Sequence, residues 1–127
     1  MSIQFNHTVV HSRNQQESAE FLADILGLEP PQRYSHFDTV QLSNGVTLDF
    51  MNAGSELVVQ HYAFLVGEPD FDEILGRIRA NSLEFWADPY RSKPNEINTQ
   101  DGGRGVYFDD PSGHILEIIT RPYGSGS

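Results

Sequence analysis

One stretch near the C-terminal end decides the fold. It reads Gly103-Arg104-Gly105-Val106-Tyr107-Phe108-Asp109-Asp110-Pro111-Ser112-Gly113-His114-Ile115-Leu116-Glu117-Ile118. The turn residues at 110–113 separate two apolar runs, so the stretch predicts two strands, over 104–108 and 114–120. Strand alternation places Glu117 on the face opposite its apolar neighbours. Because an ionised carboxylate in that setting needs a cation or several hydrogen-bond donors to offset desolvation, Glu117 is a candidate ligand.

Part of this pattern occurs earlier in the chain. Asp49 aligns with Glu117 at an offset of 68 residues, and the turns before them match as well. His7 aligns with His61 at an offset of 54, together with the apolar and amide residues that precede each histidine. A polar, turn-rich insertion of 13 residues at 91–103 accounts for nearly all of the 14-residue difference between the two offsets. A long repeat that occurs twice predicts a duplicated module, because a solenoid needs at least three units.

Each half is predicted to be a strand, a helix and two or three further strands. The first helix begins at a capping box over 14–17 and ends at Gly27, and the second begins at Asp70 with Glu73 as its reciprocal capping partner. Arg77 near the end of the second helix suits the helix dipole. The remaining predicted strands cover 3–10, 37–42, 46–51, 57–66 and 83–86.

Composition narrows the classes of function. The chain has 127 residues, a formal charge of −10 and no cysteine. The acidity argues against nucleic-acid and anionic-membrane binding. Without cysteine, a metal ion has to be held by imidazole and carboxylate. No apolar run is long enough for a membrane span and the first residues lack the pattern of a signal peptide, so we expect a cytoplasmic protein of one domain.

The repeated histidines and carboxylates suggest a shared site. If the strands of both modules curl around one concavity, alternation turns His7, Asp49, His61 and Glu117 inward. Four such groups would form a metal site. Taken singly, each of these four residues could instead be a packed or solvent-exposed side chain that binds no metal.

The stretch 103–118, together with a histidine at each module start, resembles the closing signature of the vicinal oxygen chelate superfamily. That superfamily includes glyoxalase I, extradiol dioxygenases and the fosfomycin and bleomycin resistance proteins. The resemblance covers residues 3–121 and implies an α+β fold of two βαβββ modules, forming a U-shaped mixed sheet around a divalent metal with helices on the outer face. It implies one domain over 1–123, with modules at about 1–54 and 55–123 and a flexible tail at 124–127.

The same resemblance implies the ligands. His7, His61 and Glu117 match the metal ligands of the first, fifth and eighth strands. Asp49 stands where glyoxalase-type members use a longer glutamate, so we expect it to fall short of the metal, with Asp49 or Tyr107 handling a proton instead. Three ligands leave open positions that suit Fe(II), a chelating substrate and dioxygen. Tyr107 resembles the tyrosine that extradiol dioxygenases place beside the substrate, and its alternative is an aromatic that packs in a sheet.

A narrower resemblance is to the ChaP-like oxygenases of aromatic polyketide antibiotic biosynthesis. It is carried by the segments 6–11, 60–64 and 96–105. It implies oxidative cleavage or rearrangement of a polycyclic phenol or catechol, with an external flavin or other reductant left open. The insertion at 91–103 is expected to act as a lid or substrate contact, or else to be a solvated excursion.

Two other functions stay open at this point. One is a glyoxalase-like isomerase or lyase that uses Ni(II), Zn(II) or Mn(II) with Asp49 as a ligand. The other is a non-catalytic protein that binds an aromatic compound and confers resistance. Whichever function holds, the resemblance implies a homodimer, and the sequence leaves open whether one chain or two build the site.

Overall fold

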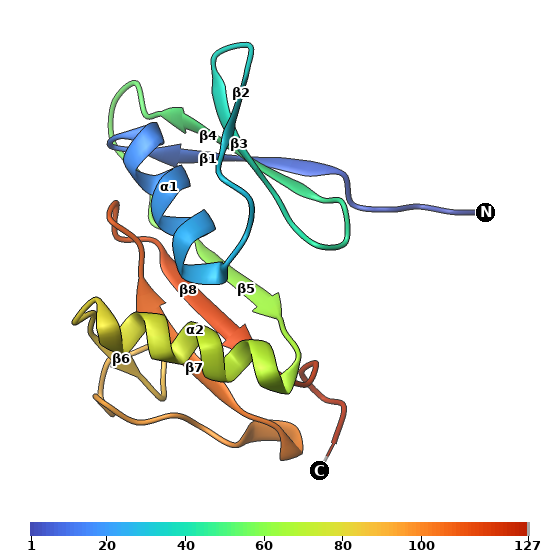
Figure 1. The fold of residues 1–127 in the computed structure, drawn as a ribbon, viewed down its shortest axis with the longest axis vertical. Coiled ribbons are helices and arrows are strands. Elements are labelled where there is room, and N and C mark those ends of the chain that lie inside the picture. Colours follow the sequence, from blue (N-terminus) through green and yellow to red (C-terminus); the bar gives the residue numbers. More distant parts are fainter. Residues whose placement is uncertain (127) are drawn as a thin grey trace. The chain divides into compact units, whose positions relative to one another are not determined.

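The strand order is the same in both halves of the chain. The computed structural model describes residues 1–126, which divide into two units, 1–58 and 59 onward. Each unit holds one four-stranded mixed sheet and one long helix, in the order expected for a βαβββ module (Figure 1). The predicted duplication and the α+β class are therefore confirmed.

The first unit has the sheet order β1-β4-β3-β2, with β1 parallel to β4 and the other pairs antiparallel. One face of this sheet packs against α1 (Figure 1). The core consists of Val10, Val40, Leu48 and Phe50 from the sheet and Ala19, Leu22, Ala23 and Ile25 from the helix. Its elements are β1 (His7–Ser12), α1 (Gln15–Leu26), β2 (Gln32–Tyr34), β3 (Phe37–Gln41) and β4 (Thr47–Asn52).

Helix α1 begins and ends where the sequence predicted. The Asn14 side chain accepts a hydrogen bond from the backbone N–H of Glu17 at 3.0 Å. Gly27 ends the helix with φ +72°, in the left-handed region where glycine carries no steric penalty. Both signals are local in sequence, which is why they could be identified without tertiary information.

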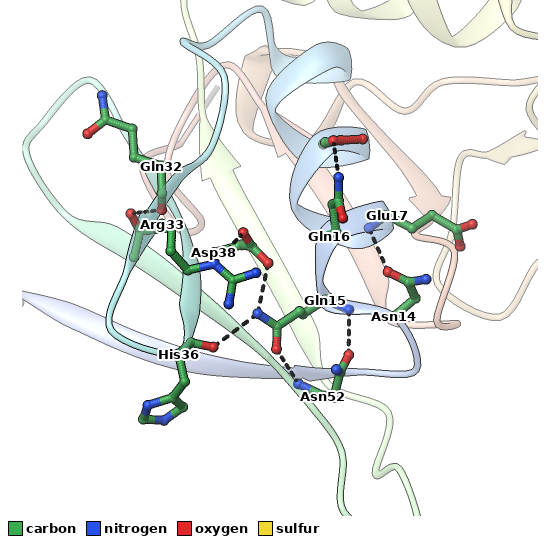
Figure 2. Close-up of polar contacts among 11 residues, drawn as sticks. Asn14, Gln15, Gln16, Glu17, Gln32, Arg33, His36, Asp38 and Asn52 are labelled. Atoms are coloured by element: carbon green, nitrogen blue, oxygen red, sulfur yellow. Dashed lines mark hydrogen bonds and ion pairs between the residues drawn. The ribbon is translucent and has the colours of Figure 1, made fainter.

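A buried glutamine joins α1 to the sheet. The Gln15 side-chain amide donates to the His36 carbonyl at 3.0 Å and to Asp38 Oδ2 at 2.8 Å, and its Oε1 accepts from the Asn52 N–H at 3.0 Å. The Gln15 N–H in turn donates to Asn52 Oδ1 at 2.7 Å. Figure 2 shows Gln15 at the centre of these contacts, with Arg33 beside Asp38. Gln15 thus connects the start of the helix to β3 and β4.

The second unit repeats this design in the order β5-β8-β7-β6, with β5 parallel to β8. Helix α2 contributes Phe71, Ile74, Leu75 and Ile78 to the core, against Val106, Phe108, Leu116 and Ile118 of the sheet. Its elements are β5 (His61–Leu65), α2 (Glu68–Ala80), β6 (Phe85–Trp86), the 3₁₀ turn η1 (Gln100–Gly102), β7 (Gly105–Asp109) and β8 (Ile115–Ile119).

The predicted start of the second helix was wrong. Helix α2 begins at Glu68, with Gly67 as the N-cap residue and no side-chain capping bond. Pro69 stands in the first turn, where its missing N–H costs nothing. From outside the helix, Arg104 donates to Glu68 Oε1 at 2.9 Å and to Asp72 Oδ1 at 2.8 Å, so this end is held by a tertiary contact.

Both module-opening strands are shorter than predicted. β1 begins at His7 and β5 at His61, because their parallel partners begin only at Thr47 and Ile115. Earlier residues therefore have no strand to pair with. The two histidines consequently open their strands, which is a feature the pattern alone could not resolve.

The insertion 91–103 contains little regular secondary structure and is held in place by side-chain contacts. Asn98 forms an isolated bridge with Gly105, and its side chain donates to the Ala87 carbonyl at 2.9 Å. Arg91 forms a bidentate contact with Asp109 at 2.8 Å. No helix among residues 1–126 is long and apolar enough to cross a membrane.

Candidate metal centre

A histidine and a carboxylate meet on the sheet face of the second unit that lies opposite α2. Glu117 occupies the middle of β8, between Ala63 of β5 and Tyr107 of β7 in the strand register. It is fully buried. The Nε2 atom of His61 lies 2.9 Å from Glu117 Oε1, while 43% of the His61 side chain stays exposed. One side chain of this pair is therefore buried and the other is partly exposed.

Two tyrosines complete this cluster. The Tyr123 hydroxyl donates to the Glu117 carboxylate and lies 2.5 Å from each carboxylate oxygen. The Tyr107 hydroxyl lies 3.2 Å from that of Tyr123, and the Tyr107 ring centroid is 5.8 Å from that of His61. We call His61, Tyr107, Glu117 and Tyr123 the β8 cluster.

Both phenols in the cluster are held in their neutral form. Burial raises the pKa of Tyr107 far above its ordinary value, and the hydrogen bond with Tyr123 and the charge of Glu117 raise it further. Burial also raises the pKa of Tyr123, and its hydrogen bond to Glu117 raises that pKa further. At neutral pH these hydroxyls therefore donate hydrogen bonds and do not act as bases.

The first unit presents the residues that align with this pair. His7 is exposed at the start of β1, and its Nδ1 lies 2.7 Å from Asn6 Oδ1. A carbonyl oxygen only accepts, so in the neutral imidazole this contact places the proton on Nδ1 and leaves the lone pair on Nε2. That is the tautomer in which metal-bound histidines are commonly fixed by a neighbouring acceptor.

Asp49 is buried between Val9 and Thr39 in the strand register. Its Oδ1 atom has no hydrogen-bond partner among the described residues. An unpaired buried carboxylate oxygen is costly, so this atom fits a cation or a donor from a bound molecule.

These residues fit a divalent metal. The His61 and Glu117 atoms are 2.9 Å apart, a separation compatible with adjacent ligands that each stand about 2.0–2.2 Å from one ion. Nitrogen and oxygen donors of this kind suit first-row transition metals. Within neither unit do residues 1–126 gather three His, Asp or Glu side chains around one point.

Of the residues predicted from the sequence, His61, Glu117 and Tyr107 are brought together by the second unit. His7 and Asp49 lie in the first unit. Sequence reasoning missed Tyr123, which follows the last strand in a segment with no periodic pattern. Its only signal is an aromatic residue next to a proline after β8, which is too weak to predict a contact.

His114, close to Glu117 in sequence, takes part in the hydrogen bonds of the turn before β8. It is buried, its Nδ1 accepts from the Gln60 N–H at 2.9 Å, and its own N–H donates to Asp110 Oδ1 at 2.8 Å. Burial raises the pKa of Asp110, and the backbone N–H donors of the turn oppose that change. These groups therefore shape the turn between β7 and β8.

Two βαβββ modules, each with a histidine that opens its first strand and a carboxylate on its last, are the arrangement expected of the vicinal oxygen chelate class of proteins. The chain belongs to the Glyoxalase/Bleomycin resistance protein/Dioxygenase superfamily, whose family model matches residues 4–118. The resemblance expected from residues 103–118 is thereby confirmed.

Individual relatives narrow the class. The structure is similar to oxidase ChaP-H2, with a TM-score of 0.96 and 57% identity over the whole of both chains. It is similar to oxidase ChaP-H1, with a TM-score of 0.95 and 57% identity, covering 97% of this chain and 99% of the other. Glutathione transferase FosA from Serratia marcescens is 30% identical over 121 residues, which are 89% of this chain and 77% of FosA. These relatives are enzymes, and the similarity supports a metal-dependent, oxygenase-like role.

Proposed function

We propose that this protein is an Fe(II)-dependent dioxygenase that acts on a polycyclic aromatic phenol or catechol of the polyketide type. The observation that carries the proposal is the contact between His61 Nε2 and the buried Glu117 carboxylate. The 57% identity to two oxidases supports oxygen chemistry.

His7 is the third ligand in this proposal. Its contact with Asn6 leaves Nε2 as the nitrogen that can bind a metal, and its exposure makes that atom accessible. The ligand set is then two imidazoles and one carboxylate, which leaves coordination positions for other molecules. We propose that a homodimer is the working form, and that His7 comes either from the same chain as Glu117 or from a second copy.

The bound metal would polarise the vicinal oxygens of the substrate and lower their pKa. The protein's own groups then divide the remaining work. Asp49, with one unpaired buried oxygen, accepts a proton or hydrogen bond from a substrate hydroxyl. Tyr107, held neutral, donates a hydrogen bond to a substrate oxygen. The insertion 91–103, anchored through Asn98, contributes substrate contacts.

The experiment is an oxygen-uptake assay. Apo protein is loaded anaerobically with Fe(II), mixed with a polycyclic catechol or quinol, and exposed to oxygen in an electrode cell, with and without reduced flavin. Uptake that requires both Fe(II) and substrate, and is lost in His61→Ala, supports the proposal. His36→Ala, which removes an exposed histidine outside the proposed ligand set, is the matched control and should keep activity. Tight substrate binding in chelator with no uptake or product would instead favour a binding protein.

A glyoxalase-like isomerase or lyase is the second candidate, and the unpaired Asp49 oxygen is the observation that favours it. In that case Asp49 is a fourth ligand to Ni(II), Zn(II) or Mn(II). Asp49→Asn should then weaken metal binding by about tenfold or more. An unchanged metal dissociation constant counts against this candidate.

A further inference from the structure

We propose that the Tyr123 hydroxyl and a metal ion compete for Glu117, so that the segment 121–126 gates metal binding. The inference rests on the proposed function, because it takes Glu117 as a metal ligand. It assigns a role to a residue and a segment outside the ligand set.

The Tyr123 hydroxyl occupies the space that a metal ion bound to Glu117 would take. The Tyr123 oxygen is equidistant from Oε1 and Oε2 of Glu117, at 2.5 Å from each. It therefore lies on the open side of the carboxylate, between the two oxygens. A divalent ion bound to either oxygen from that side would stand about 2.0–2.2 Å from it, which is the space that the hydroxyl fills. Metal binding from this side requires Tyr123 to leave.

The residues after Tyr123 are held by hydrogen bonds to the insertion. The N–H groups of Gly124 and Gly126 donate to the Asp101 carboxylate at 3.1 Å and 3.2 Å. Ser125 N–H donates to the Pro122 carbonyl at 3.1 Å, which closes a turn around Tyr123. Asp101 belongs to the insertion, so this segment is tethered to a loop that is itself a candidate substrate contact.

The Tyr123 side chain can move outward without disturbing the core. Its residue is 57% exposed, so its ring contributes little to the core. The contacts that hold it are the hydrogen bond to Glu117, the Tyr107 hydroxyl at 3.2 Å and hydrogen bonds of the neighbouring backbone at the surface. Swinging the segment outward leaves β8 and its strand pairs intact. The hydroxyl acts on Glu117 and the tether sets how often it does so.

The experiment compares metal affinity at one fixed pH. Apo protein is titrated with Co(II), read by its visible absorption, and with Zn(II) against a chromophoric chelator. Tyr123→Phe removes only the competing hydroxyl, and Asp101→Asn weakens the tether without altering the cluster. Tyr90→Phe, at an exposed tyrosine in the same unit, is the matched control.

We expect Tyr123→Phe to bind both ions about tenfold more tightly or better, since a hydrogen bond to a buried charge no longer opposes the ion. Asp101→Asn should change the affinity in the same direction by a smaller factor, and the control should match the wild type. Hydrogen exchange gives an independent readout: Zn(II) should speed exchange of the Gly124 and Gly126 amides in the wild type.

Equal or weaker metal binding by Tyr123→Phe would overturn the gate while leaving the proposed function standing. Unchanged exchange at Gly124 and Gly126 on metal binding would overturn it as well. If no variant binds either ion, the proposed metal centre fails and the gate fails with it.

Discussion

Replacing Gln15 by alanine tests how the first unit is held together. Three side-chain hydrogen bonds are lost: two to backbone groups of His36 and Asn52, and one to the Asp38 carboxylate. The backbone bond from Gln15 to Asn52 survives. Gln16 provides the matched control, because it is the same residue type one position along and makes one exposed contact with Glu20.

The expected loss in the free energy of unfolding follows from the partners of these three hydrogen bonds. A bond to a charged group contributes about 1.5–3 kcal/mol and a neutral one about 0.5–1.5 kcal/mol. Gln15 and Asp38 line an open polar pocket, so water entering it after the substitution would replace part of the lost hydrogen bonding. We therefore expect Gln15→Ala to lower the free energy of unfolding by about 3 kcal/mol, and Gln16→Ala by less than about 0.5 kcal/mol.

The assay is urea denaturation followed by far-UV circular dichroism. With a slope of about 2 kcal/mol per M, the midpoint of Gln15→Ala should fall by about 1.5 M. The midpoint of Gln16→Ala should stay within the error of the wild type. If the two variants have the same midpoint, the reasoning about Gln15 is refuted.

Substitutions at two further positions test the second unit. Asp110→Ala removes the acceptor for the N–H groups of Ser112 and His114 and should cost about 1–3 kcal/mol by thermal denaturation, whereas Asp110→Asn, which keeps that oxygen, should cost less. Equal losses would show that the acceptor is unimportant. Gly105→Ala places a methyl group 2.8 Å from Asn98 Oδ1, so limited proteolysis should cut the insertion several-fold faster; an unchanged rate would contradict the anchoring role of Asn98.

Local and duplicated features were predictable from the sequence. Asn14 and Gly27 mark the ends of α1 because capping depends only on neighbouring residues. The alignments of His7 with His61 and of Asp49 with Glu117 revealed the modules, since equivalent strand positions keep equivalent chemistry. The contact between His61 and Glu117 follows from that logic, because β5 and β8 are neighbours in the sheet.

The remaining features depend on contacts between distant residues. Gln15 and Gln16 are the same residue type in adjacent positions, and only packing against β3 and β4 makes the first one buried. The contact of Arg104 with Glu68 joins residues 36 positions apart. Pro69 in the first turn of α2 is a local signal for the helix start that the sequence-based prediction overlooked. The Tyr123 contact with Glu117 depends on a turn after β8 and on a tether to the insertion. None of these leaves a periodic pattern.

Elemental analysis of the protein purified without chelator, with Glu117→Gln as the comparison, tests whether Glu117 belongs to an iron site. We expect about one iron per chain in the wild type and a large loss of iron in Glu117→Gln. A wild-type protein that carries no transition metal, or that carries nickel or zinc to the exclusion of iron, would contradict it.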